Sequence, residues 1–181
     1  MNPYSLHIVG HSLGGHLSGI IGRSVIQQSQ NRIKLLRISA LDPAFPLFYP
    51  ITDGSLPINV NDATLVDIIH TDADKYGAPV VTGCVDFVVN GGTRFQPGCP
   101  VGNFTSLCSN DTCSHQRSVA LWAESVSTLR PTFLATSSKF PSFKIHMGIE
   151  CPIIVSGAPG TYLVETNSEP PYSTTPKFSL S

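Results

Sequence analysis

A serine flanked by glycines, between an apolar run and a helical pattern, is the feature that most constrains this chain. Residues 6–16 read LHIVGHSLGGH, an apolar segment followed by Gly-x-Ser-x-Gly, and apolar residues at helical spacing come next. This context predicts a strand, a strained turn and a helix, with the Ser12 hydroxyl exposed at the carboxyl end of the strand. The N–H of Leu13 would then point to where an oxyanion forms. The motif alone is weak, and an ordinary glycine-rich strand–helix turn is the alternative.

The elements after Ser12 predict an α/β protein, the C-terminal part of a mostly parallel α/β-hydrolase sheet that starts at the elbow strand. We expect a helix from about Leu13 to Gln28, apolar strands over 34–41, 63–72 and 84–89, a helix opening near Ser114 and a strand over 160–167.

These elements predict one partial hydrolase domain over residues 1–167, and a disordered polar tail over 168–181. A hydrolase sheet normally has several strands before the elbow, and a loop among them donates a second oxyanion N–H. We expect neither these strands nor this loop in residues 1–181. We therefore expect an N-terminally truncated chain whose residues 1–181 alone are nearly inactive.

The composition excludes several classes of function. The chain has 181 residues, is 41% hydrophobic and carries a net charge of −1, which suits one globular domain and gives no basic excess for nucleic acid. Its apolar runs fall short of the roughly 20 residues that span a bilayer. A charged leader with an apolar core is not visible, so a signal peptide would have to be lost with the missing N-terminus.

Five cysteines favour an oxidising compartment: Cys84, Cys99, Cys108, Cys113 and Cys151. Two glycosylation sequons, at Asn103 and Asn110, support the same interpretation. A zinc site is the alternative, although the chain lacks a Cys-x-x-Cys pair. Because five is odd, at least one thiol is free or has its partner elsewhere.

Candidate partners for Ser12 lie at the ends of the next strands. Asp42 ends the strand over 34–41, where a catalytic acid is expected, although Asp before Pro also simply caps turns. His70 and His115 both follow Asp42, as the Ser–Asp–His chain order requires. Because the histidine of this fold sits on a loop after the sheet, His115 is favoured. His70 is then a pocket-wall residue, and Phe45 lines an acyl-chain site or packs over the sheet edge.

The chain resembles the pancreatic-lipase family, and especially its insect neutral lipases and venom phospholipases. The stretches that carry the resemblance run in the family's order and include GHSLGGH at 10–16, LDPA at 41–44, DIIHTD at 67–72, QPGC at 96–99, CSHQRS at 113–118 and YLVETN at 162–167. The resemblance implies Ser12 as the nucleophile, Asp42 as the orienting acid, His115 as the base and Leu13 as an oxyanion donor.

The resemblance also implies that a disulfide between Cys99 and Cys113 closes a lid over residues 99–113. A short lid is typical of the family's phospholipases, which cleave the sn-1 ester, and predicts weak interfacial activation. Cys84 departs from the family pattern, as does Cys151 standing alone after Phe133, and Cys108 competes for Cys113.

The predicted function is hydrolysis of lipid esters by a secreted triacylglycerol lipase or phospholipase that contacts a membrane or lipid interface transiently. We expect no metal, organic cofactor, nucleic acid or colipase-type partner. The alternatives are a catalytically inactive yolk or carrier protein of the same fold, an inactive gene fragment, and an esterase with non-lipid substrates.

Overall fold

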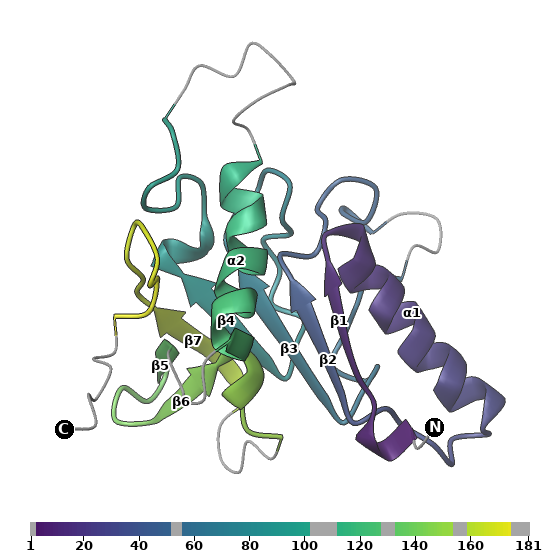
Figure 1. Cartoon of the computed structure of the whole chain (residues 1–181). Helices are drawn as coiled ribbons and strands as arrows, with labels where there is room; N and C mark the ends of the chain where they lie inside the picture. The colour runs from purple at the N-terminus through teal and green to yellow at the C-terminus, as the bar shows by residue number, and fades with distance from the viewer. Residues whose placement is uncertain (1–2, 52–55, 102–111, 128–132, 154–158, 175–181) are drawn as a thin grey trace.

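The computed structural model describes residues 3–51, 56–101, 112–127, 133–153 and 159–174. In these ranges a seven-stranded, mostly parallel sheet has the order β1-β2-β3-β4-β7-β5-β6, with α2 crossing in front of it in Figure 1. The strands are β1 (His7–His11), β2 (Arg37–Leu41), β3 (Leu65–His70), β4 (Val85–Val89), β5 (Phe133–Ser137), β6 (Lys144–Met147) and β7 (Gly160–Val164). The helices are α1 (Leu13–Gln28), α2 (Cys113–Ser127) and three short 3₁₀ turns, η1 (Pro3–Ser5), η2 (Asn90–Gly92) and η3 (Gly148–Glu150).

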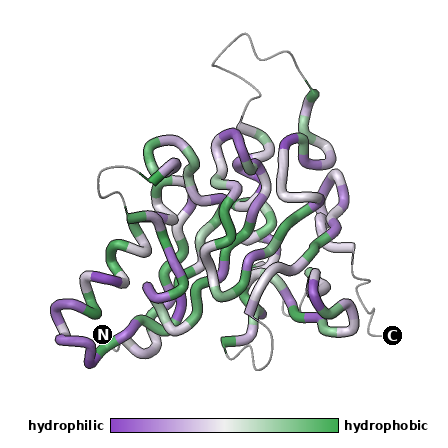
Figure 2. Tube along the Cα trace, turned by 180° about the vertical axis from the view of Figure 1, so that it is seen from behind, coloured by the Kyte–Doolittle hydropathy of each residue, from purple (hydrophilic) through white to green (hydrophobic). Residues whose placement is uncertain are grey.

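The central strands are apolar because helices and loops cover the sheet on both faces. Every residue of β2 and β3 is buried, as expected of parallel strands. Successive residues of a strand face opposite ways, so Val66 and Ile68 pack in a cluster that Val25 of α1 adjoins. Ile69 packs instead with Leu121 of α2 in the larger cluster. Hydrophobic residues accordingly follow the strands through the middle of the molecule (Figure 2).

The parallel part of the sheet confirms the predicted α/β class. The sheet begins at the elbow strand β1, and α1 has the predicted bounds. The hairpin of β5 and β6 was not predicted from the sequence, and it lies antiparallel beside β7. Its Ser, Thr and Lys residues suggest a loop, but alternate β5 residues are buried, as in a strand with one face against the core. None of the helices within the described ranges is long and apolar enough to cross a membrane.

Residues 168–174 differ from the predicted disordered tail. The Glu124 carboxylate accepts hydrogen bonds from the backbone N–H groups of Tyr172 and Ser173, at 2.6 and 3.0 Å. Tyr172 also packs against the larger core cluster, and Thr166 pairs with Ser173. The composition could not reveal this, because the stabilising carboxylate lies about fifty residues away on α2. Residues 175–181 lie outside the described residues.

A buried ion pair joins the sheet to the segment after β6. Arg37 Nε and Nη2 donate to the two carboxylate oxygens of Asp67 at 2.7 and 3.0 Å. The same guanidinium donates to the carbonyl oxygens of Gly148 and Ile149. Ser39 Oγ donates to Asp67 as well, so this carboxylate is fully engaged without water.

We predict that Arg37→Met destabilises the fold by about 3–5 kcal/mol, because it leaves the Asp67 carboxylate buried and unpaired. Urea unfolding followed by circular dichroism would measure the loss. The double variant Arg37→Met/Asp67→Leu should recover most of it, and Arg32→Met, on the exposed surface, should change stability by less than about 0.5 kcal/mol. An Arg37→Met protein as stable as the parent would contradict the prediction.

Candidate active site

Ser12 occupies a sharp turn between β1 and α1. Its backbone has φ 56° and ψ −122°, a conformation that side chains rarely adopt. The Ser12 N–H donates to the carbonyl of Leu41 at 3.0 Å, and the Ser12 carbonyl accepts from the N–H groups of Gly15 and Ala44. The turn therefore lies against the end of β2, and its strained backbone is held by hydrogen bonds on both sides.

The absence of a side chain at Gly10 is what allows the turn to close. A Cβ at this position would lie 2.1 Å from the carbonyl oxygen of Gly14 and 2.5 Å from Ser18 Oγ. Since Ser18 Oγ also donates to the Gly14 carbonyl at 2.7 Å, β1 and the first turn of α1 are in direct contact here. The first glycine of the motif, Gly10, is therefore required for a steric reason in this chain.

Asp42 and His115 form a hydrogen-bonded pair across 73 residues of sequence. His115, in the first turn of α2, donates from Nδ1 to Asp42 Oδ2 at 2.6 Å. Asp42 follows the last residue of β2 and is fully buried, and His115 is 6% exposed. The other oxygen of Asp42 accepts from the backbone N–H groups of Thr71 and Asp72, just beyond β3. The carboxylate is thereby fixed from two sides.

His11 connects the Ser12 turn to this pair. His11 immediately precedes Ser12, and its Nε2 hydrogen-bonds to the carbonyl oxygen of His115 at 3.2 Å. The two imidazole rings lie 4.4 Å apart. Burial, and then the neighbouring His115, lower the pKa of His11, which favours its neutral form. The structure thus brings the Ser12 turn, Asp42 and His115 together at the carboxyl ends of β1 and β2.

The remaining predicted residues occupy different surroundings. Leu13, the first residue of α1, is 54% exposed, and the helix start leaves its N–H without an intrahelical partner. Phe45 stacks against Tyr49 in the loop after β2. His70 is buried, and its two ring nitrogens donate to Asp86 and to the carbonyl of Ala78. Burial alone would lower the pKa of His70, but the hydrogen bond and charge of Asp86 raise it overall.

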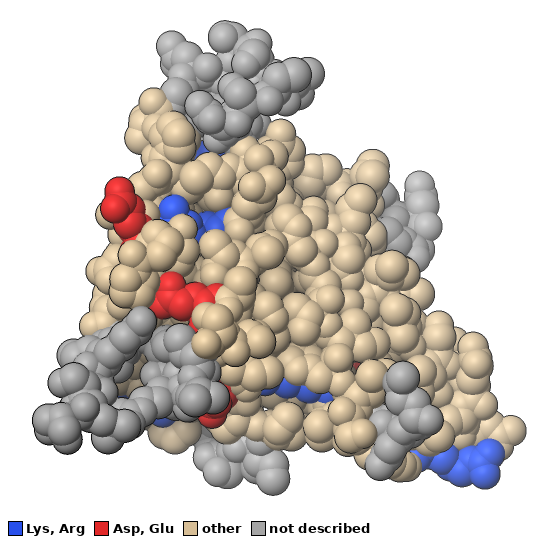
Figure 3. Space-filling model, viewed as in Figure 1, with Lys and Arg blue, Asp and Glu red and all other residues tan. Residues whose placement is uncertain are grey.

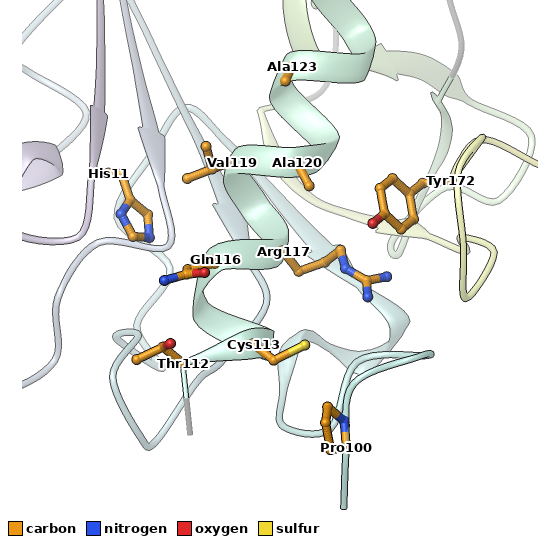
Figure 4. Close-up of a pocket in the computed structure, with 10 residues that line it drawn as sticks. All are labelled: His11, Pro100, Thr112, Cys113, Gln116, Arg117, Val119, Ala120, Ala123 and Tyr172. Carbon is orange, nitrogen blue, oxygen red and sulfur yellow. The ribbon is translucent and has the colours of Figure 1, made fainter. Parts of the chain in front are cut away.

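A cavity of about 700 Å³ opens beside His11 along the exposed side of α2 (Figure 4). Gln116 and Val119 extend from α2 into the region nearest His11, while Arg117 extends towards Tyr172. The Arg117 guanidinium lies 4.4 Å from the centre of the Tyr172 ring, and its buried Nη1 has no hydrogen-bond partner among the described residues. Neither His70 nor Phe45 lines this cavity, so their predicted role in a pocket wall stays a prediction.

The disulfide between Cys99 and Cys113 is present, and it joins the segment after β4 to the first residue of α2. The alternative of a zinc site at these two cysteines is therefore wrong. Cys84 and Cys151 carry free thiols, and burial raises the pKa of Cys151. Cys108 and the two sequons, within residues 102–111, lie outside the described residues.

The polar residues around the Asp42–His115 pair were not predicted from the sequence. Asp72 and Tyr76 contact the pair from the segment after β3, and Arg94, from the segment after β4, binds Asp72. Of the described residues, Asp42, Asp72 and His115 also form a group whose donor atoms lie within 4.8 Å, close enough for a metal ion. His115 Nδ1 is bonded to Asp42 and the Asp72 carboxylate to Arg94, so the donor set fits a hydrogen-bonded network better than a metal site.

Comparison with known proteins assigns the chain to a family. The family described as "Lipase" matches residues 1–171. The chain belongs to the lipase family. It is 36% identical over 149 residues to lipase member H of Oryctolagus cuniculus, across 81% of this chain and 30% of that protein. It is 34% identical over 165 residues to phospholipase A1 member A of Bos taurus, across 89% of this chain and 34% of that protein.

A further relative, lipase member H-B of Xenopus laevis, is 41% identical over 127 residues, 67% of this chain and 25% of that protein. The chain thus spans about a quarter to a third of the length of these curated relatives. Membership of the insect branch stays a prediction.

Gly77 packs directly against the Asp42 carboxylate, so we predict that Gly77→Ala breaks the Asp42–His115 hydrogen bond. The new Cβ would lie 2.4, 2.5 and 2.6 Å from Oδ1, Oδ2 and Cγ of Asp42. Proton NMR should show loss of the downfield His115 Nδ1 proton, and stability should fall by about 1–3 kcal/mol. Gly14→Ala is the control, because a Cβ there meets nothing within 4 Å. An unchanged Nδ1 proton in Gly77→Ala would contradict the prediction.

The lowered pKa of His7 predicts how the folding stability depends on pH. Burial, and then the charge of Arg37, lower the pKa of His7 from 6.5 to about 4. Between these values the unfolded chain binds a proton that the folded chain does not, so stability falls as the pH drops through this window. His7→Gln should flatten this dependence in urea titrations at several pH values from 4 to 7. An equal slope in both proteins would show that His7 does not cause it.

Proposed function

We propose that this chain carries the catalytic residues of a secreted lipid-ester hydrolase, with Ser12 as nucleophile, His115 as general base and Asp42 as the orienting acid. The observation that carries the proposal is the 2.6 Å hydrogen bond from His115 Nδ1 to Asp42, beside the strained turn at Ser12. A buried carboxylate on Nδ1 directs the free Nε2 lone pair outward, as a base acting on a serine hydroxyl requires. Relatives named as lipase and phospholipase A1 support the same reaction class.

The reaction would proceed by two acyl transfers. Ser12 Oγ attacks the ester carbonyl carbon while His115 Nε2 takes the hydroxyl proton. The tetrahedral intermediate collapses, and the alcohol leaves with the proton returned by His115. Water, activated by the same base, then hydrolyses the acyl-serine. Asp42 stabilises the imidazolium that forms in each half of the reaction.

Backbone N–H groups would stabilise the oxyanion. We assign one of them to Leu13, because the first N–H groups of α1 point away from the helix and carry the positive end of its dipole. Loss of one such donor typically slows acyl transfer by about 100–1000-fold. A second donor is a part of the proposed site that we do not assign to any residue of this chain.

The surroundings of the site favour a lipid substrate. Large apolar side chains are exposed in the segments that follow the carboxyl ends of the strands: Leu13 after β1, Leu47 and Ile51 after β2, and Val101 after β4. Charged side chains are sparse on the face drawn in Figure 3. Exposed apolar residues around a site mark surfaces that contact lipids or other apolar partners. The proposed substrates are therefore triacylglycerols or phospholipids at an interface.

The Cys99–Cys113 disulfide supports two finer parts of the proposal. It fits a secreted protein, since disulfides persist in oxidising compartments. It also closes a loop of short sequence separation, 14 residues, which we propose as the lid. A short lid offers little apolar surface to an oil droplet, so phospholipid is the favoured substrate and interfacial activation should be weak.

We predict that Ser12→Ala abolishes covalent labelling by a fluorophosphonate, together with any hydrolysis of p-nitrophenyl butyrate that residues 1–181 retain. In a fully active enzyme the loss would be roughly 10⁴–10⁶-fold, because the nucleophile and its base act as one unit. Asp42→Asn should slow labelling about 10⁴-fold through the wrong imidazole tautomer. Ser24→Ala, on the same helix, is the matched control. Mass spectrometry should find the label on Ser12, and label on any other residue would refute the assignment.

A further inference from the structure

Arg94 forms a charged pair at the edge of the candidate site. It lies shortly after η2, and its Nε donates to Asp72 Oδ1 at 2.7 Å while Nη2 donates to Oδ2. The Asp72 side chain is fully buried, and that of Arg94 is 8% exposed. Planar guanidinium groups bind carboxylates in this two-point manner more strongly than an ammonium group does. The Asp72 charge is therefore balanced inside the protein.

Asp72 is the second carboxylate beside His115. Its backbone N–H donates to Asp42 Oδ1 at 3.1 Å. Donor atoms of Asp72, Asp42 and His115 all lie within 4.8 Å of one another. His115 therefore faces two buried acids, and it is hydrogen-bonded through Nδ1 to Asp42.

Tyr76 makes a second connection between Arg94 and His115. The Arg94 guanidinium lies 5.3 Å from the centre of the Tyr76 ring, and that ring lies 5.6 Å from the imidazole of His115. The Tyr76 N–H also donates to Asp72 Oδ2 at 3.3 Å. Arg94 thus contacts Asp72 and Tyr76, two of the groups that pack beside the imidazole.

Without the positive charge of Arg94 beside it, Asp72 would change the proton affinity and the orientation of the His115 imidazole. A buried negative charge at this distance stabilises the imidazolium, because the protein interior screens charges less than water does. A base held in its protonated form cannot accept the hydroxyl proton of Ser12. Asp72 would also compete with Asp42 for the imidazole, and the defined orientation would be lost.

We propose that Arg94 is a positioning residue that cancels the charge of Asp72, so that Asp42 alone sets the orientation and proton affinity of His115. Within the described residues, the charged or titratable groups facing His115 are His11 from β1, Asp42 just after β2, and Asp72 and Tyr76 from the segment after β3. Arg94, from the segment after β4, contacts Asp72 and Tyr76. The importance of the Arg94–Asp72 charge balance for catalysis rests on the proposed function. The effect of these two charges on the titration of His115 does not.

The test is an NMR titration of the ¹⁵N-labelled imidazoles in the whole chain, which requires no activity. Arg94→Gln leaves Asp72 unbalanced and should raise the His115 titration midpoint by roughly one pH unit. Asp72→Asn leaves Arg94 unbalanced and should lower it by a similar amount. The double variant should return to within about 0.3 units of the parent, since the net charge is restored.

Two further variants separate charge from structure. Arg94→Lys keeps the charge but loses the two-point hydrogen bond, so its midpoint should stay near that of the parent. Arg23→Gln removes the ion pair between Arg23, a residue of α1, and Asp62. It should leave the titration midpoint of His115 unchanged. If Arg94→Gln does not fold, the downward shift in Asp72→Asn still decides the question.

Shifts of the same sign in both single variants, or no shift in Asp72→Asn, would overturn the proposal. Such a result would leave the proposed function intact, because that depends on labelling of Ser12. Conversely, opposite shifts in a chain whose Ser12 is not labelled would support the charge balance and refute the hydrolase assignment. Where hydrolysis is measurable, the acid limb of the kcat/KM profile should move in the same direction as the NMR midpoint.

Discussion

The hydrogen-bonded ladder of the parallel strands continues past their ends, and the candidate site depends on this continuation. The Ser12 N–H bonds to the last residue of β2, and the Asp42 N–H bonds to Ile69 of β3 at 2.7 Å. Ser12 and Asp42 are therefore placed by backbone contacts that belong to the sheet rather than to a separate loop. A site held in this way inherits the rigidity of the buried core. The side chains then lie close enough to interact directly, as His115 does with Asp42.

Charge is scarce in this chain, and several of its charged groups are buried in pairs. Only 23 of the 181 residues are Lys, Arg, Asp or Glu, yet Arg37–Asp67, Arg94–Asp72 and His70–Asp86 all lie inside the fold. Buried pairs contribute little net stability but are costly to break one partner at a time. Their shared value here is geometric, because each ties a strand end to a different segment. Of the three pairs, Arg94–Asp72 lies beside the candidate site and helps to specify its arrangement.

Local sequence pattern predicted the parts of the fold whose signals are local. The elbow at Ser12, the bounds of α1 and the buried strands β2 and β3 follow from glycine spacing and apolar periodicity. Chain order allowed both His70 and His115, and the expected place of the histidine after the sheet strands favoured His115. The structure places His115 against Asp42 and His70 against Asp86. By contrast, the contact between Arg94 and Asp72 spans 22 residues and has no motif. The β5–β6 hairpin was not predicted either, because its Ser, Thr and Lys residues suggest a loop. The alternation of buried and exposed residues along β5 arises only from its packing beside β7.

The disulfide fixes both ends of the segment between Cys99 and Cys113, and Cys113 is two residues before His115. Its anchor points belong to the scaffold, so changes within the segment are mechanically separated from the imidazole. Mutations could therefore alter its length, charge or apolar content while Asp42 still holds His115 in place. Under the proposed function, substrate preference and bond-breaking chemistry would then be properties that can evolve independently. The disulfide would in this way allow related proteins to differ in the segment between the two cysteines without losing the Asp42–His115 contact.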